Sequence, residues 1–287
     1  MLLNLLLLVC PTITSAIHVT VLAIDEEKID VSFRGTSTDV ISDKDREIFQ
    51  LTDTNLKKGV HVLFDETPDD VFIKNPTPWG DLHDQYGWDE VKTVLKPIFG
   101  RLVSKKSERQ TVAKQTYDNK SAILANFTAN FTRPLQETIN IIWVDSELSV
   151  HENISHEFEL FKFGGKQQFL SAPWGVDTTK METFRMSSEK VETVVEPGQS
   201  VTVEIKLTKT VLTIEVVYEA TLTGKVAINY ENKFRGHHFW SVGVNEVLSR
   251  IGLKNSIKSK EVIDIVFYSK EEQIFSDPDF ENVAKNM

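Results

Sequence analysis

The residues whose types and spacing suggest chemistry are two histidine pairs and two acidic pairs. His151 and His156 flank Glu152 in a run one residue too long for the H-E-x-x-H zinc motif. A separation of five residues places the two rings on different faces of a helix and on opposite faces of a strand. His237 and His238 are adjacent, so on a strand they point to opposite sides and share a metal ion poorly. Neither pair predicts a zinc site.

The second histidine pair is expected to pack beside Phe239 and Trp240 rather than to bind metal. Asp69-Asp70 and Asp277-Pro-Asp279 lie in loop contexts with no partner acid or base, and we expect them on the solvated surface. The chain also has no G-x-S-x-G motif, no glycine-rich phosphate loop and no EF-hand spacing. We therefore predict no catalytic residue, no metal, no cofactor and no enzymatic activity.

The charge balance excludes several binding functions. The 287 residues include 32 Lys+Arg and 42 Asp+Glu, a formal net charge of −10, and 40% of the residues are hydrophobic. An acidic chain lacks the basic surface that nucleic-acid binding requires, and it also lacks a polybasic patch for anionic membranes. The length allows one long all-β domain or two smaller ones.

The N-terminus has the features of a secretory signal peptide. Leu2 to Cys10 is apolar apart from Asn4, Pro11 ends the run, and Thr14-Ser15-Ala16 offers small residues before a cut. The alternative is a buried N-terminal strand or helix. Cleavage after Ala16 would remove the single cysteine, so a mature chain of about 271 residues has neither thiol chemistry nor disulfides. The predicted location is extracellular.

Secretion gives meaning to a cluster of N-x-S/T sequons. Four lie close together and none occurs elsewhere; they begin at Asn119, Asn126, Asn130 and Asn153. We expect at least two to carry glycans, which would place this stretch on the surface.

Alternating hydrophobicity predicts a mainly β protein. The clearest strands are Ile17–Ile24, Ser200–Lys209 and a last one containing Ile263, Ile265 and Phe267. The interval Asp43–Lys58 tolerates a helix. The apolar spacing in Asp89–Ser104 favours a kinked or two-piece helix, interrupted by Pro97 and Gly100.

These patterns divide the chain into four regions. They are a signal peptide over residues 1–16, a head over 17–107, a β module over 108–270 and an acidic tail over 271–287. Within the head, the aromatic segment Trp79–Trp88 has the residues to bind sugars or to form a packed hairpin, and packing is favoured.

Two segments of the β module are distinctive in sequence. They are YEATLTGKVAINY and GHHFW, which include Tyr218, Gly224, Tyr230, Gly236, His237, His238, Phe239 and Trp240. Together with the chain from roughly Trp79 to Tyr268, they resemble the aerolysin-like proteins of the epsilon-toxin and mosquitocidal-toxin type, and most closely the spherulins and insect follicular-epithelium yolk proteins.

The resemblance implies an elongated antiparallel β architecture with a smaller N-terminal α+β head. Pore-forming members of the wider family form homo-oligomers and insert an amphipathic segment as a transmembrane β-barrel. In this chain that segment would fall within about residues 137–165. The resemblance also implies a membrane or glycan receptor as a partner.

Alternation within residues 148–162 is compatible with a barrel strand. The apolar face comprises Leu148, Val150, Ile154, Phe158 and Leu160. Glu152, His156 and Lys162 interrupt this face, and an ionised group at the bilayer midplane costs about 2–4 kcal/mol. A glycan on Asn153 would also hinder insertion. An amphipathic strand that covers a β core is therefore favoured.

Two functions follow from these features. The favoured one is a secreted, glycosylated, non-enzymatic yolk or storage protein that keeps the aerolysin-like fold without forming pores. The alternative is an oligomerising, membrane-permeabilising effector in defence, venom or host interaction. Dye release from liposomes separates the two.

Overall fold

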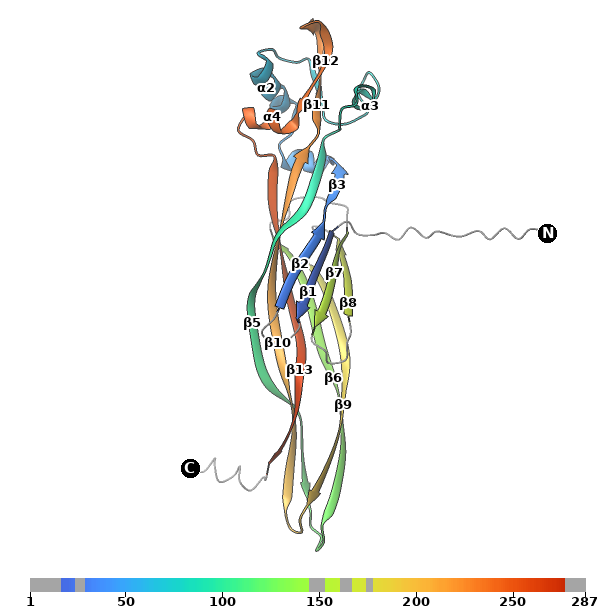
Figure 1. Ribbon diagram of the computed structural model, residues 1–287, viewed down its shortest axis with the longest axis vertical. Helices are drawn as coiled ribbons and strands as arrows, with labels where there is room; N and C mark the ends of the chain where they lie inside the picture. The colour runs from blue at the N-terminus through green and yellow to red at the C-terminus, as the bar shows by residue number, and fades with distance from the viewer. Residues whose placement is uncertain (1–16, 24–28, 145–152, 161–166, 174–177, 277–287) are drawn as a thin grey trace, which may run out of the picture.

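The computed structural model describes residues 17–23, 29–144, 153–160, 167–173 and 178–276. The molecule is an elongated rod of long strands, with helices gathered at one end (Figure 1). The strands are β1 (Ile17–Ala23), β2 (Ile29–Gly35), β3 (Ser37–Val40), β4 (Asp70–Phe72), β5 (Lys92–Asp118), β6 (Ala125–Val144), β7 (Asn153–Leu160), β8 (Gln167–Pro173), β9 (Thr178–Val195), β10 (Ser200–Thr223), β11 (Lys225–Phe234), β12 (His237–Gly243) and β13 (Ser256–Ser276). The helices are α1 (Asp43–Ile48), α2 (Asp53–Phe64), α3 (Leu82–Tyr86) and α4 (Val244–Arg250).

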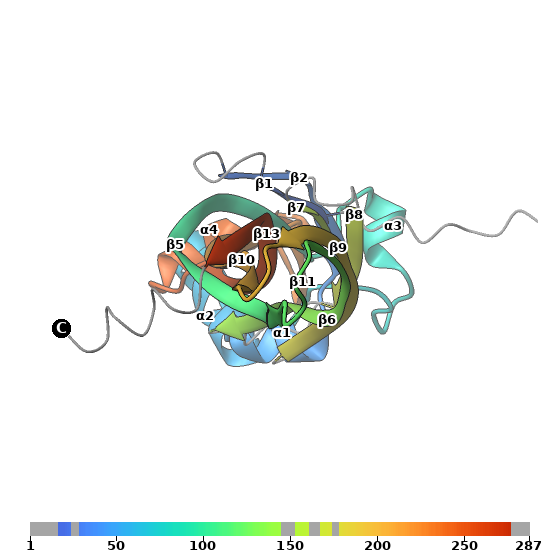
Figure 2. The ribbon, with the colours of Figure 1, turned by 90° about the horizontal axis from the view of Figure 1, so that it is seen from below.

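The body is built on a six-stranded antiparallel sheet in the order β3-β5-β10-β13-β6-β9. Viewed along the rod, the long strands of this sheet curl around the axis (Figure 2). β10 is central, and its pairing with β5 extends over almost its whole length. Register shifts mark β-bulges in these ladders, and such bulges let long strands bend and twist. This architecture confirms the expected mainly β, elongated fold.

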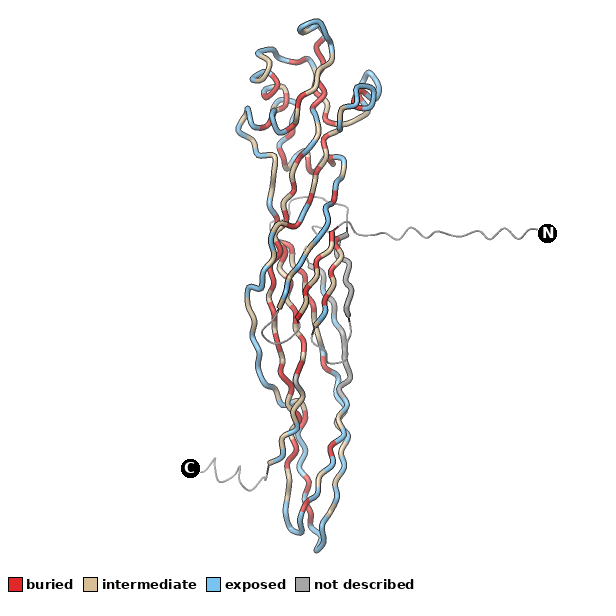
Figure 3. The backbone as a smooth tube through the Cα atoms, viewed as in Figure 1, coloured by how far each residue is buried: buried red, intermediate tan, exposed pale blue. Residues whose placement is uncertain are grey.

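A second sheet, in the order β2-β1-β7-β8, lies beside the large sheet. Its inner residues Ile17, Val19 and Val21 on β1 join one apolar core with residues such as Ile141 and Ile263 of the large sheet. Burial alternates along the strands, and exposed residues prevail toward the lower end of the rod (Figure 3). In both sheets, apolar residues at every second position therefore form the face that packs into the core.

The head contains the small sheet β12-β11-β4 and the helices α2, α3 and α4. α2 packs directly against α4. The contact at Gly59 is so close that a Cβ there would lie 2.6 Å from Cγ1 of Val247. Gly224 joins β10 to β11 with φ +97°, and a Cβ there would lie 2.1 Å from the carbonyl oxygen of Glu90. Both positions require glycine for close backbone approach.

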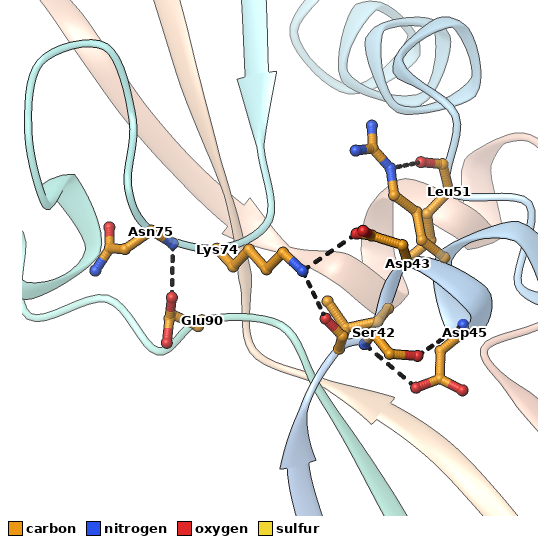
Figure 4. Close-up of polar contacts among 9 residues, drawn as sticks. Ser42, Asp43, Asp45, Leu51, Lys74, Asn75 and Glu90 are labelled. Atoms are coloured by element: carbon orange, nitrogen blue, oxygen red, sulfur yellow. Dashed lines mark hydrogen bonds and ion pairs between the residues drawn. The ribbon is translucent and has the colours of Figure 1, made fainter. Parts of the chain in front are cut away.

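Polar contacts fix the junction between head and body (Figure 4). The ammonium group of Lys74 donates to the carbonyl oxygen of Ile41 at 3.0 Å and pairs with Oδ1 of Asp43 at 3.3 Å. The backbone N–H of Asn75 donates to Oε1 of Glu90 at 2.6 Å. These contacts tie the segment after β4 to the starts of α1 and β5.

The predicted helix over Asp89–Ser104 is wrong, because most of this segment belongs to β5. Val91, Thr93, Leu95 and Pro97 are buried in alternation. Pro97 lies opposite Tyr218 at a register shift, where a missing N–H is tolerated. Pairing with β10 satisfies the remaining backbone groups and outweighs the helical spacing of the apolar residues.

Two predicted boundaries also differ from the structure. β5 continues through residue 107, so the chain does not divide there, and β1 and β2 belong to the body rather than to the head. β13 extends to Ser276, beyond the expected start of the tail at residue 271. The helix-tolerant interval 43–58 does contain α1 and the first half of α2, and Ser42 begins α1 with a capping box.

Candidate functional site

In sequence, the β7–β8 hairpin lies between β6 and β9, two strands that pair with each other. β6 and β9 form a continuous antiparallel ladder from Ala125 opposite Val195 to Ile142 opposite Thr178. β6 continues to Val144 and still pairs there with β13, whereas β7 and β8, which follow β6 in sequence, belong to the second sheet. The hairpin pairs instead with β1, in parallel, so it belongs to the second sheet. Removing it from that position would break no hydrogen bond of the β6–β9 ladder.

β7 directs its apolar face at the large sheet. Ile154 and Phe158 are fully buried, and Leu160 packs against the same core. Ser155 and Glu157 alternate with them and are half-buried. The structure thus places three residues of the predicted insertion face together, in contact with the body. The other two, Leu148 and Val150, lie outside the described residues, as do His151, Glu152 and Lys162.

A buried polar cluster joins this hairpin to the large sheet. Nε2 of His156 lies 2.5 Å from Oε1 of Glu261 on β13, and both side chains are fully buried. The hydroxyl of Tyr218 on β10 donates to Oε2 of the same carboxylate at 2.6 Å. Burial, together with the neighbouring carboxylate, raises the pKa of Tyr218 well above its ordinary value. The ring of Trp143 lies 5.4 Å from that of Tyr218.

Sequence reasoning missed Glu261, although a signal was present. The inward parity of β13 runs Ser259, Glu261, Ile263, Ile265 and Phe267, and the glutamate occupies an otherwise apolar position next to a serine. A charged residue at a core position needs a partner. The position predicts a buried pair, but the sequence does not identify His156 as its partner.

The sequons differ in their accessibility. Asn119 is 3% exposed, and its amide nitrogen donates to the carbonyl oxygens of Ile123 and Val195. Asn119 is therefore buried, which differs from the expectation that this stretch lies on the surface. Asn126 and Asn130 are exposed on one face of β6. The side chain of Asn153 lies outside the described part of the chain.

The aromatic segment of the head combines packing with exposure. The ring of Trp79 lies 5.3 Å from Phe239 and 5.8 Å from Phe72, and Tyr86 stacks on Trp88 at 4.7 Å. Trp79 remains 42% exposed and Tyr86 52%. The result is a packed aromatic cluster with two accessible rings.

The remaining motif residues have structural contacts. Nδ1 of His238 lies 2.8 Å from the carbonyl oxygen of Tyr230, and the ring of His237 meets Trp240 edge-on at 5.7 Å. Burial raises the pKa of Tyr230 to about 12. Asp69 accepts from the backbone of Glu231, so this acidic residue links a loop to β11.

Within the described ranges, no three His, Cys, Asp or Glu side chains are grouped so that they could hold a metal ion. No helix among the same residues is both long and apolar enough to span a bilayer.

The chain has known relatives in sequence and in fold. No known family profile matches it. It is 33% identical over 253 residues to U-megalopygitoxin(8)-Mo12 of Megalopyge opercularis, an alignment that covers 88% of each chain. The chain belongs to the U-megalopygitoxin(8) family. A second U-megalopygitoxin(8), Mc8 of Megalopyge crispata, is 32% identical to it with the same coverage.

The fold of this U-megalopygitoxin(8) family member matches that of a bacterial toxin. Parasporin-2, a Bacillus thuringiensis toxin that recognizes cancer cells, superposes with a TM-score of 0.67 at 14% identity. The match covers 84% of this chain and 98% of parasporin-2. At this identity the likeness establishes the fold alone, which is aerolysin-like and mainly β.

These comparisons do not support the yolk-protein and spherulin subgroup or the storage function. The related sequences are named as toxins, and the solved structure with the same fold is a toxin. The expectation of an aerolysin-like fold is confirmed, whereas the expectation of a yolk or storage function is not supported.

Proposed function

We propose that the protein is a secreted toxin that oligomerises on a target membrane and forms a β-barrel pore with the β7–β8 hairpin. Membership of a toxin family and the fold of parasporin-2 support this proposal. The observation that carries it is the position of the hairpin. It interrupts two paired strands, yet it is docked on a separate sheet.

In the proposed pore, the ladder of β6 and β9 continues into residues 143–177. The segment is long enough for a turn and two strands that each exceed the roughly 9–11 residues that a transmembrane strand needs. The insertion segment proposed here therefore extends beyond the expected interval of 137–165. Neighbouring copies would pair edge to edge until the barrel closes, because open edges are not tolerated in lipid.

The face of β7 that is now buried would then meet lipid. Ile154, Phe158 and Leu160 would exchange the body of the protein for acyl chains, while Ser155 and Glu157 would face the water-filled lumen. Burial in the monomer thus keeps an apolar surface away from water until a membrane is available.

The proposal includes an extracellular location after removal of Met1 to Ala16, and activity without a catalytic step. Receptor contact is assigned to the head, where Trp79 and Tyr86 offer exposed rings that suit either a sugar or a lipid interface. Asn126 and Asn130 are proposed as glycan acceptors on the body.

Dye release tests this function. Purified protein, with and without its glycans, is added to dye-loaded liposomes at pH 5 and pH 7, and oligomers are examined by electrophoresis. The proposal predicts leakage together with heat-stable oligomers in at least one condition. The absence of both, under every condition and with membranes prepared from susceptible cells, would overturn it.

A further inference from the structure

We infer that His156, Glu261 and Tyr218 form a polar clasp that holds the β7–β8 hairpin on the body and sets how readily it leaves. The three side chains come from β7, β13 and β10, so the contact spans the two sheets. The inference deepens the proposed function, on which its biological meaning rests. The structural claim concerns the soluble monomer and can be tested without a membrane.

The surroundings of the clasp are apolar. Val19 on β1 is the Cα partner of His156, while Trp143 on β6 and Val216 on β10 flank Glu261 in the large sheet. All three are buried. Among the described side chains, the titratable groups that face the pair are the imidazole, the carboxylate and the phenol themselves. The buried hydroxyl-bearing Ser259 is next on β13.

The cationic side chains of neighbouring strands lie on the opposite face of the large sheet. Lys260 and Arg101 pair there with Glu215 at 2.8 Å and 3.2 Å. Neither is positioned to neutralise Glu261. His156 is therefore the side chain that compensates the buried carboxylate from the hairpin, and Tyr218 compensates it from within the sheet.

One of the two ring nitrogens of His156 contacts Glu261. Nε2 faces the carboxylate, whereas Nδ1 is buried and has no hydrogen-bond partner among the described residues. Within that part of the chain, the contact with Glu261 is therefore the hydrogen bond that orients the imidazole. If the hairpin leaves the body, both side chains are hydrated again, and the free-energy cost of their desolvation is recovered.

This property distinguishes a polar clasp from an apolar contact. Replacing a buried ion pair by well-packed apolar residues is often neutral or stabilising, whereas removing one partner leaves an uncompensated polar group and is strongly destabilising. Ile154 and Phe158 supply apolar adhesion to the body. The clasp would then reduce the net strength of docking below that of an all-apolar interface, and it would fail when either partner is lost.

Hydrogen–deuterium exchange of the soluble monomer tests this inference. In Glu261→Leu, amides of residues 153–160 should exchange at least about tenfold faster than in the wild type, while the β10–β13 ladder stays protected. In the triple variant His156→Leu/Tyr218→Phe/Glu261→Leu, the same amides should be protected as well as in the wild type or better. Glu215→Gln, on the other face of β10, serves as the control and should leave them unchanged.

The outcomes are decisive in both directions. Unchanged exchange in Glu261→Leu, or a triple variant that opens as fast as the single one, overturns the clasp. If Glu261→Leu does not fold, Glu261→Gln is measured in its place, and unchanged exchange there is equally contradictory. Dye release by the triple variant should be slower than by the wild type. If the wild type itself releases no dye, pore formation fails while the exchange results still decide the clasp.

Discussion

Ile142 on β6 and Thr178 on β9 are Cα partners at the end of their ladder, and β7 and β8, which lie between these two strands in sequence, belong to the second sheet. Such a hairpin can be repositioned as a unit because the strands that carry it are already paired. The docked hairpin, its buried face and the paired strands of β6 and β9 form one arrangement.

Replacing Phe158 by glutamate should have opposite effects on two steps, the release of β7 from the body and the insertion of the hairpin into the membrane. The change places a charge in the core of the monomer, so β7 should exchange faster. The same charge would face lipid in the pore, where charged substitutions are destabilising, so leakage should fall. Exchange and dye release are measured on one preparation, with Glu157→Gln on the opposite face as the control. Leakage equal to that of the wild type would contradict the proposed lipid-facing side.

Acid should weaken the body through two cross-strand carboxylates. Hydrogen bonds from Lys114 and Lys206 lower the pKa of Glu204 below its usual 4.5, and Lys260 and Arg101 do the same for Glu215. A lowered folded-state pKa means stability that is present above pH 4.5 and lost as the pH falls through the folded value. The free energy of unfolding, measured from pH 6 to pH 2.5, should decline in that window.

The acid effect has a direct control. In Glu215→Gln, one of the two titrating groups is absent, so the decline with falling pH should be smaller than in the wild type. An identical pH profile would show that this carboxylate gains nothing from its two cationic neighbours.

Gly224→Ala should destabilise the joint between head and body. Its φ of +97° is strained for any other residue, and a new Cβ would overlap the carbonyl oxygen of Glu90. Gly198→Ala meets the same kind of backbone, at φ +72°, with open space around it. Thermal unfolding should show a clearly larger fall in Tm for Gly224→Ala. Equal falls would mean that the close approach to Glu90 is unimportant.

Glycan mapping should distinguish the sequons by their burial. When the chain passes through a secretory pathway, glycopeptide mass spectrometry should find Asn126 and Asn130 occupied and Asn119 unmodified. Asn119→Ala should cost about 1–3 kcal/mol of stability, because two carbonyl oxygens lose their donor. Asn126→Ala, at an exposed position, should be nearly neutral. A fully occupied Asn119 in folded protein would contradict the observed hydrogen bonding.

Strands in which apolar and polar residues alternate were predictable from sequence, because one face of each strand is buried. Val203, Ile205 and Leu207 of β10 are inward, and Ile263 and Ile265 of β13 repeat the pattern. The apolar face of β7 was predictable in the same way. Each of these assignments needs only local parity, which the sequence contains.

What could not be predicted depends on partners distant in sequence. The start of β5 has helical apolar spacing, and only its pairing with β10 makes it a strand. His156 and Glu261 are separated by most of the β module, so their contact follows from the way two sheets pack. In sequence, Asn119 is an ordinary sequon, and its hydrogen bond to the carbonyl oxygen of Val195 becomes evident only in the structure.

An engineered disulfide tests the central claim most directly. Thr20 on β1 and Glu157 on β7 are Cα partners, a spacing suited to a disulfide, and Cys10 is the one cysteine of the sequence. A matched control links Thr128 to Glu192 within the β6–β9 ladder, which the proposal leaves intact. The oxidised Thr20→Cys/Glu157→Cys variant should release no dye from liposomes until it is reduced, whereas the control should leak in both states. Equal leakage by the oxidised and reduced forms of the hairpin-locked variant would contradict insertion of the β7–β8 hairpin.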